Sequence, residues 1–175
     1  HFHADQTHGI NDLRFFYLKN KKKVPVYADK RTKNYLINTF SYCFKSSTSY
    51  PATLEMNRVK KLHIYKYGKE KILIKSIPVQ HGNISSICYI INNKCAYAPD
   101  INKIYPKDLI HFKNLKYLVI DCLRYDPHPS HFNLVGVINL IKLIKPKKTI
   151  ITNLNNEIDY LAIKKKLPKN VIPAY

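Results

Sequence analysis

The second half of the chain alternates short apolar runs of strand type with longer runs of helical spacing, and this alternation narrows the available folds most. Strands that alternate with helices favour a layered α/β design, in which a mixed sheet is covered by helices on its outside. The predicted helices stop near prolines, which cannot continue a helix. The expected elements are Tyr117–Asp121 and Thr149–Thr152 as strands, and Phe132–Ile144 and Glu157–Leu167 as helices.

The first half reads mostly as hairpins after a helical start. Paired β-type runs flank short turns, one centred on Gly68 and the other on Asn92 and Asn93, which tolerate positive φ. The expected hairpin strands are Leu62–Tyr67 with Lys71–Val79, and Ser86–Ile91 with Lys94–Ala98. Helices are expected at Gly9–Leu18 and Lys33–Phe44, with a short strand between them at Val24–Ala28.

Composition indicates one globular domain, residues 1–175, in the cytoplasm. Hydrophobic residues make up 45% of the chain, and no apolar run reaches the roughly 18 residues that a bilayer span needs. The segment His1–Asn11 has neither the basic nor the apolar region of a signal peptide. Four cysteines without a C-x-x-C pair indicate buried free thiols in a reducing compartment.

The net charge of +19 allows two interpretations. A basic surface attracts phosphates, nucleic acid or anionic lipid. However, Lys, Asn, Ile and Tyr are enriched together, which favours compositional drift in an AT-rich genome. The lysines are spread along the chain without interleaved aromatic residues, so a nucleic-acid partner is not expected. A basic rim could still steer a phosphorylated substrate.

The first eight residues, His1-Phe2-His3-Ala4-Asp5-Gln6-Thr7-His8, concentrate metal-ligand chemistry. Neutral imidazoles two positions apart with a carboxylate close behind suit Zn, Fe or Mn. A purification-tag remnant is the alternative, but further ligand types follow at the ends of predicted strands. These are His81, Asp100 and Asp121, and strand ends hold ligands rigidly.

This order of residues resembles the metallo-β-lactamase superfamily, and within it the phosphodiesterase branch related to the cyclic-phosphate hydrolase of phosphonate breakdown. That branch typically reads H-A-D-H-x-x-G-I-D-D-L-R, which His3-Ala4-Asp5 and Gly9-Ile10-Asn11-Asp12-Leu13-Arg14 resemble. Leu123–Phe132 is similar to its L-R-Y-x-P-H-P-T-H-F segment, and the resemblance continues to Ile172–Tyr175. It implies an αββα sandwich. Because family members begin upstream of the His-rich loop, a partial fold lacking its N-terminal strands is expected, with an exposed sheet edge and apolar face.

The resemblance also implies a ligand set. His1, His3 and His81 match the ligands of the first metal, Asp5 matches a ligand of the second, and Asp100 matches the bridging carboxylate. Family histidines are replaced by Gln6, Asn153 and Asn156. Amides hold zinc poorly compared with imidazole, so we expect one ion, Zn²⁺ or Mn²⁺/Fe²⁺, and a weak or empty second site.

The expected function is that of a metal-dependent phosphodiesterase acting on a small phosphate ester, with weak or lost activity. Asp5, His128 and His131 are the candidate catalytic residues, and either His128 or His131 is the expected general acid. The alternatives are an inactive remnant or binding module of the same fold, and a basic nucleic-acid-binding protein. An upstream fragment or a second copy of the chain is the expected macromolecular partner.

Overall fold

The computed structural model describes residues 1–174, so Tyr175, at the end of the Ile172–Tyr175 segment, lies outside the described residues. The chain groups into two compact units, His1–Val59 and Lys60–Tyr175. The single domain expected from the sequence stays a prediction. Of the helices that the structure describes, none combines the length and apolarity that crossing a bilayer requires.

The first unit packs short helices around a parallel pair of strands. Val24 of β1 pairs with Leu54 of β2 in parallel register, so the short strand expected at Val24–Ala28 is present and has a partner that the sequence did not predict. The predicted helix Lys33–Phe44 is two helices, because the chain leaves helical geometry at Phe40, with ψ of 42°. The elements are α1 (Ala4–Thr7), η1 (His8–Leu13), α2 (Arg14–Asn20), β1 (Val24–Ala28), α3 (Lys30–Thr39), α4 (Ser41–Phe44) and β2 (Leu54–Arg58).

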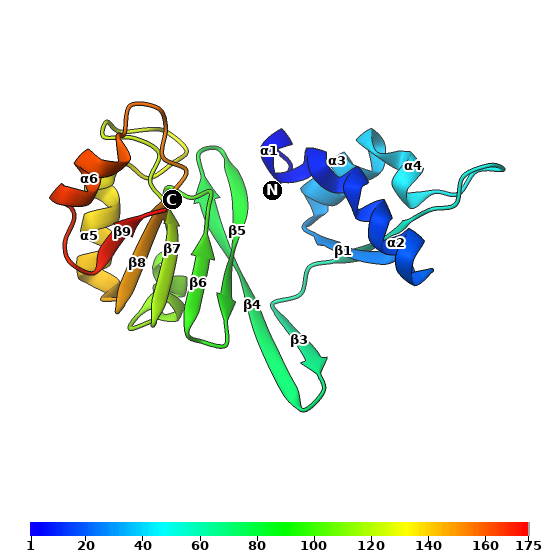
Figure 1. Ribbon diagram of the computed structural model, residues 1–175, viewed down its shortest axis with the longest axis horizontal. Coiled ribbons are helices and arrows are strands. Elements are labelled where there is room, and N and C mark those ends of the chain that lie inside the picture. The colour runs from blue at the N-terminus through cyan, green and yellow to red at the C-terminus, as the bar shows by residue number, and fades with distance from the viewer. Residues whose placement is uncertain (175) are drawn as a thin grey trace. The chain divides into compact units, whose positions relative to one another are not determined.

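The second unit is built on one mixed sheet with the strand order β3-β4-β5-β6-β7-β8-β9 (Figure 1). Its first three pairings are antiparallel and the last three are parallel. The strands are β3 (Leu62–Tyr67), β4 (Glu70–His81), β5 (Ile84–Ile91), β6 (Cys95–Ala98), β7 (Tyr117–Asp121), β8 (Lys148–Thr152) and β9 (Val171–Pro173). Both hairpins and the two later strands are therefore confirmed, whereas β2 and β9 were not expected.

The hairpin turns follow the chemistry that predicted them. Gly68 has φ of 57°, and Asn92 and Asn93 have φ of 51° and 53°. Left-handed φ costs Gly nothing and is tolerated by Asn, which is why these residues can close tight turns.

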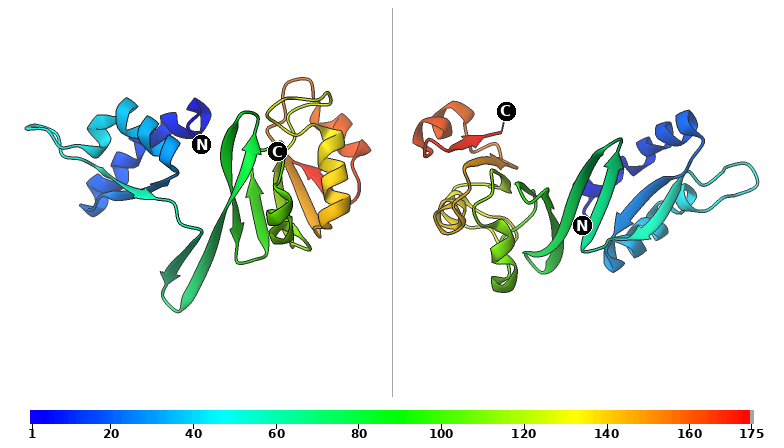
Figure 2. Two further views of the ribbon diagram at one scale, coloured as in Figure 1. Left: turned by 180° about the vertical axis from the view of Figure 1, so that it is seen from behind. Right: turned by 90° about the horizontal axis from the view of Figure 1, so that it is seen from below.

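One face of the sheet is buried against helices η2 (Pro106–Phe112), α5 (Leu134–Ile144) and α6 (Tyr160–Lys166) (Figures 1 and 2). Leu118 and Ile120 of β7 are inaccessible to solvent, whereas Val119 between them is half-buried, as the two-residue period of a strand requires. α5 begins at Leu134 because Asn133 accepts a hydrogen bond from the amide of Gly136. α6 begins at Tyr160 rather than Glu157, because Asp159 caps it through Ala162.

The other face and the β3 edge keep large apolar side chains exposed. Tyr97 and Tyr117 are 44% and 38% exposed on the face opposite the helices. Ile64, on the edge strand β3, is 55% exposed. The lack of N-terminal strands that led us to expect an exposed edge and apolar face stays a prediction.

Candidate metal centre and active site

The candidate site residues of the second unit lie at the carboxyl ends of its strands. Strands β4, β6, β7 and β8 run in the same direction, so their carboxyl ends lie at a common edge. His81 ends β4, Asp100 lies two residues beyond β6, Asp121 ends β7, and Asn153 follows β8. Residues that are distant in sequence therefore meet where a rigid sheet positions them.

His81 is oriented by the loop that carries His131. Its Nδ1 lies 2.7 Å from the backbone carbonyl oxygen of Ser130, and the residue is only 2% exposed. Because a carbonyl oxygen can only accept, Nδ1 carries the proton and donates it. With its proton on Nδ1, His81 has Nε2 as the ring nitrogen that would coordinate a metal, the arrangement that metal-binding histidines use.

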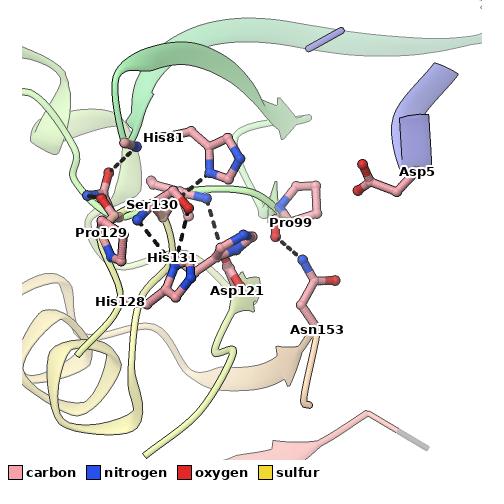
Figure 3. Close-up of polar contacts among 12 residues, drawn as sticks. Asp5, His81, Pro99, Asp121, His128, Pro129, Ser130, His131 and Asn153 are labelled. Carbon is pink, nitrogen blue, oxygen red and sulfur yellow. Dashed lines mark hydrogen bonds and ion pairs between the residues drawn. The ribbon is translucent and has the colours of Figure 1, made fainter. Parts of the chain in front are cut away.

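His131 is held in the same way by a buried carboxylate (Figure 3). Its Nδ1 donates to Oδ2 of Asp121 across 2.6 Å, and the same oxygen accepts the amide of Ile101 at 3.1 Å. Burial raises the pKa of Asp121 to about 6, although the hydrogen bond from His131 and the one from the Ile101 amide oppose this shift. Because Nδ1 is bonded to Asp121, Nε2 is the nitrogen of His131 that would meet a metal or a substrate.

The His128 side chain contacts Ser130, two residues later in the same loop. Its Nδ1 accepts from the amide of Ser130 at 3.3 Å and lies 3.2 Å from the Ser130 hydroxyl. Partial burial, and then electrostatic interaction with His131, Arg124 and His81, lower the pKa of His128. The ring remains 5.1 Å from that of His131, so both histidines of the motif belong to one cluster.

The donor atoms of His81, Asp100 and His131 all lie within 4.8 Å of one another. Asp100 is buried, at 2% exposure. Two imidazoles with their Nδ1 atoms already engaged and a nearby carboxylate match the chemistry of a divalent transition-metal site. The residues present thus fit the kind of ion that the sequence predicted.

The remaining predicted residues lie in the first unit. His1 and His3 are ring neighbours, with centroids 4.4 Å apart. The side-chain amide of Gln6 donates to the carboxylate of Asp5 across 3.1 Å. Their assignment as ligands, and that of Asp5 as catalytic, stays a prediction. Nε2 of His8 lies 2.9 Å from the hydroxyl oxygen of Tyr35.

Asn153 is also engaged. Its amide nitrogen donates to the backbone carbonyl of Pro99, immediately before Asp100 (Figure 3). It adopts φ of 60°, a left-handed conformation that Asn tolerates.

Sequence reasoning did not give Asp121 a partner and did not consider Ser130 or Asn102. The only signal for Asp121 was an acid at a strand end. Nothing in the sequence marks a backbone carbonyl as the group that orients a histidine, because that contact joins residues 49 positions apart.

Comparison with known proteins agrees with this geometry. Residues 1–152 match the model of the β-lactamase superfamily domain. A crystal structure described as a new diphosphatase from the PhnP family superimposes with a TM-score of 0.87 at 26% identity, covering 100% of this chain and 65% of that one. The chain thus spans somewhat less than two thirds of that relative.

More distant structures share the fold. The metallo-β-lactamase-fold protein YhfI from Bacillus subtilis matches with a TM-score of 0.73 and 15% identity, covering 99% of this chain and 71% of that one. The short form of human tRNase Z matches with a TM-score of 0.68 and 13% identity, covering 99% and 73%. No curated protein matches the chain.

The mixed sheet, its helices and the His/Asp cluster define a metallo-β-lactamase fold, whose members typically bind divalent metals and act as hydrolases. The chain belongs to the β-lactamase superfamily domain family, as the match over residues 1–152 shows.

Proposed function

We propose that this chain is a metal-dependent hydrolase of small phosphate esters, acting as a phosphodiesterase with weak activity. The observation that carries the proposal is the pair of oriented imidazoles beside Asp100: His81 held by the Ser130 carbonyl, and His131 held by buried Asp121. The diphosphatase similarity and the net charge of +19, which attracts anionic substrates, support a phosphate ester.

One ion, Zn²⁺ or else Mn²⁺ or Fe²⁺, is the proposed cofactor, with a weak or empty second site. Among the residues of the second unit, His81 and Asp100 would hold the ion. It would supply an activated water and polarise the phosphoryl group. Gln6 and Asn153 stand where the family has histidines, and the weaker zinc binding of amides supports a weak or empty second site.

His131 is the proposed general acid. As an imidazolium it donates the Nε2 proton to the leaving oxygen and becomes neutral, while Nδ1 stays bonded to Asp121. The negative charge of Asp121 stabilises the imidazolium before the transfer. We assign this role to His131 rather than His128, because Nδ1 of His128 is occupied by Ser130 and no carboxylate is bonded to its ring in the described structure. Asp5 remains a proposed ligand and catalytic residue.

The experiment is elemental analysis of the purified chain, together with turnover of bis-p-nitrophenyl phosphate by the same sample. His81→Ala is expected to abolish stoichiometric metal, and His131→Ala to lower kcat while metal is retained. His111→Ala, on η2 and outside the cluster, is the matched control. Retained metal in His81→Ala would refute the ligand assignment. Lost metal in His131→Ala would make His131 a ligand instead of the acid.

The second candidate is a binding module of the same fold without catalysis. Gln6 and Asn153 favour it, because they stand where the family has histidines and amides hold zinc poorly compared with imidazole. Stoichiometric metal without turnover would support it over the hydrolase. The cytoplasm is the proposed location of either, supported by the free cysteines.

A further inference from the structure

Asn102 contacts both the turn that follows His81 and the loop that precedes His131, and it lies two residues after Asp100. Its side-chain Oδ1 accepts the amide of Gly82 at 3.2 Å, and its Nδ2 donates to the carbonyl of Pro129 at 2.7 Å. Gly82 follows His81, and Pro129 lies two residues before His131. A single partly buried amide therefore joins the turn that carries one histidine to the loop that carries the other.

The backbone around Asn102 is itself held firmly, so the side chain has a defined position. The amide of Asn102 donates to the Gln80 carbonyl at 2.9 Å, and the Gln80 amide donates to the Lys103 carbonyl at 3.0 Å. These two bonds form an isolated antiparallel bridge beside the end of β4. Asn102 is thus fixed to the strand that ends in His81.

The neighbouring residue makes the same kind of connection to the other histidine. Ile101 donates its amide to Asp121, which holds His131, and its carbonyl accepts the amide of Phe132 at 2.9 Å. Residues 101–103 follow Asp100 directly. One short segment therefore contacts the elements carrying His81, His131 and Asp121.

The turn at Gly82 and the loop at Ser130 lie in close contact, which leaves little room for either to move. A Cβ added at Gly82 would lie 2.9 Å from Cβ of Ser130, and Gly82 has φ of +60°. The same loop supplies the Ser130 carbonyl that orients His81. A small displacement of the loop would therefore move His131 and release the ring of His81 together.

We propose that Asn102 is a positioning residue, which sets the separation of His81 and His131 by clamping the loop 128–131 onto the β4–β5 turn. It touches neither imidazole itself. Its importance for metal binding rests on the proposed function, whereas its clamping of the loop does not. Residues that orient metal ligands through such contacts typically change metal affinity by about 10- to 100-fold when they are replaced.

Asn102→Asp is the sharpest variant, because it keeps an oxygen for Gly82 but removes the donor to Pro129. Asn92→Ala is the control: Asn92 also accepts a backbone amide, that of Leu73 at 2.8 Å, but it lies at the β5–β6 turn, the opposite edge of the sheet. Both variants lose a hydrogen bond, and only the first loses one at the site.

Two measurements on the full chain test whether Asn102 holds the loop and whether it affects metal binding. Hydrogen exchange of the amides of residues 128–132 in metal-free protein is expected to accelerate about tenfold in Asn102→Asp, the effect of losing one hydrogen bond that holds the loop. Co²⁺ affinity, followed by the visible spectrum of the bound ion, is expected to fall about 10- to 100-fold. Asn92→Ala is expected to lower Tm while leaving both readouts at their wild-type values.

Wild-type loop exchange in a folded Asn102→Asp variant would overturn the clamp. Accelerated exchange with unchanged Co²⁺ affinity and spectrum would overturn its link to the metal site. If the wild-type chain bound no Co²⁺, the proposed function would fail, and loop exchange alone would decide the role of Asn102.

Discussion

Asp121→Asn removes a charge from the site with little change in shape. His131 and Ile101 both donate to the same oxygen, Oδ2, while Oδ1 has no hydrogen-bond partner within residues 1–174. An asparagine with its oxygen in the Oδ2 position can accept both bonds and place its NH₂ where Oδ1 was. The geometry of His131 is then kept, and only the negative charge beside its imidazolium is lost.

The loss in rate follows from the difference between charged and neutral hydrogen bonds. A bond to a charged group contributes about 1.5–3 kcal/mol, against about 0.5–1.5 kcal/mol for a neutral one. The difference of roughly 1–2 kcal/mol corresponds to a decrease in kcat of about 5- to 30-fold. If the asparagine turned its NH₂ toward His131, the decrease would approach the full contribution of general acid catalysis, about 10²- to 10⁴-fold.

Stability of the metal-free chain is expected to change in the opposite direction. The pKa of Asp121 is raised from 3.8 to about 6 by burial, so the native state binds this proton more tightly than the unfolded state does. The free energy of unfolding therefore falls as the pH rises from about 4 to about 6, by up to about 3 kcal/mol, and stays reduced above that range. Asn cannot ionise, so the variant lacks this decrease.

Urea unfolding of metal-free wild type and Asp121→Asn at about pH 4 and about pH 8, with phosphodiester turnover alongside, measures both effects. We expect the variant to be slower in turnover yet at least as stable as wild type at the higher pH. Unchanged kcat would refute the role of Asp121 in holding a catalytic imidazolium. A variant that is less stable than wild type at about pH 8 would refute the electrostatic reasoning.

Three further predictions concern other parts of the chain. Restoring histidine at both Gln6 and Asn153 is expected to raise metal content toward two ions per chain by elemental analysis, and unchanged stoichiometry in a folded variant would contradict the ligand mapping. Gly82→Ala is expected to lower the free energy of unfolding by about 1–2 kcal/mol or more in urea titrations, because φ is +60° and the added Cβ would lie 2.9 Å from a carbon of the facing loop. Burial raises the pKa of the Cys88 thiol far above its usual value and that of the Cys122 thiol to about 12. Neither thiol should therefore react with a thiol reagent at about pH 8 until urea unfolds the chain. Rapid labelling of either cysteine in the native state would disprove its burial.

Local patterns in the sequence were sufficient to predict most of the strands. Strands β1, β3 and β7 match their predicted bounds, because alternating apolar residues and the turn residues Gly68 and Asn92 act over a few positions. The helix starts were less accurate, since Asp159 and Asn133 become caps only when the preceding loop is in place. The short strand β9 carried too few residues for a periodic signal.

The sequence by itself determined the residue types of the candidate site: the histidines and acids, their order, and their places at strand ends. It also determined the resemblance that led to the family. Only the tertiary structure decided which nitrogen of His81 and of His131 donates a hydrogen bond within the protein, because the Ser130 carbonyl and the Asp121 carboxylate reach Nδ1 of each ring from distant parts of the chain. Only the tertiary structure, too, brought Asn102 between Gly82 and Pro129. Proton positions depend on the partner that each polar atom meets, and those partners are chosen by the packing of the sheet and its loops.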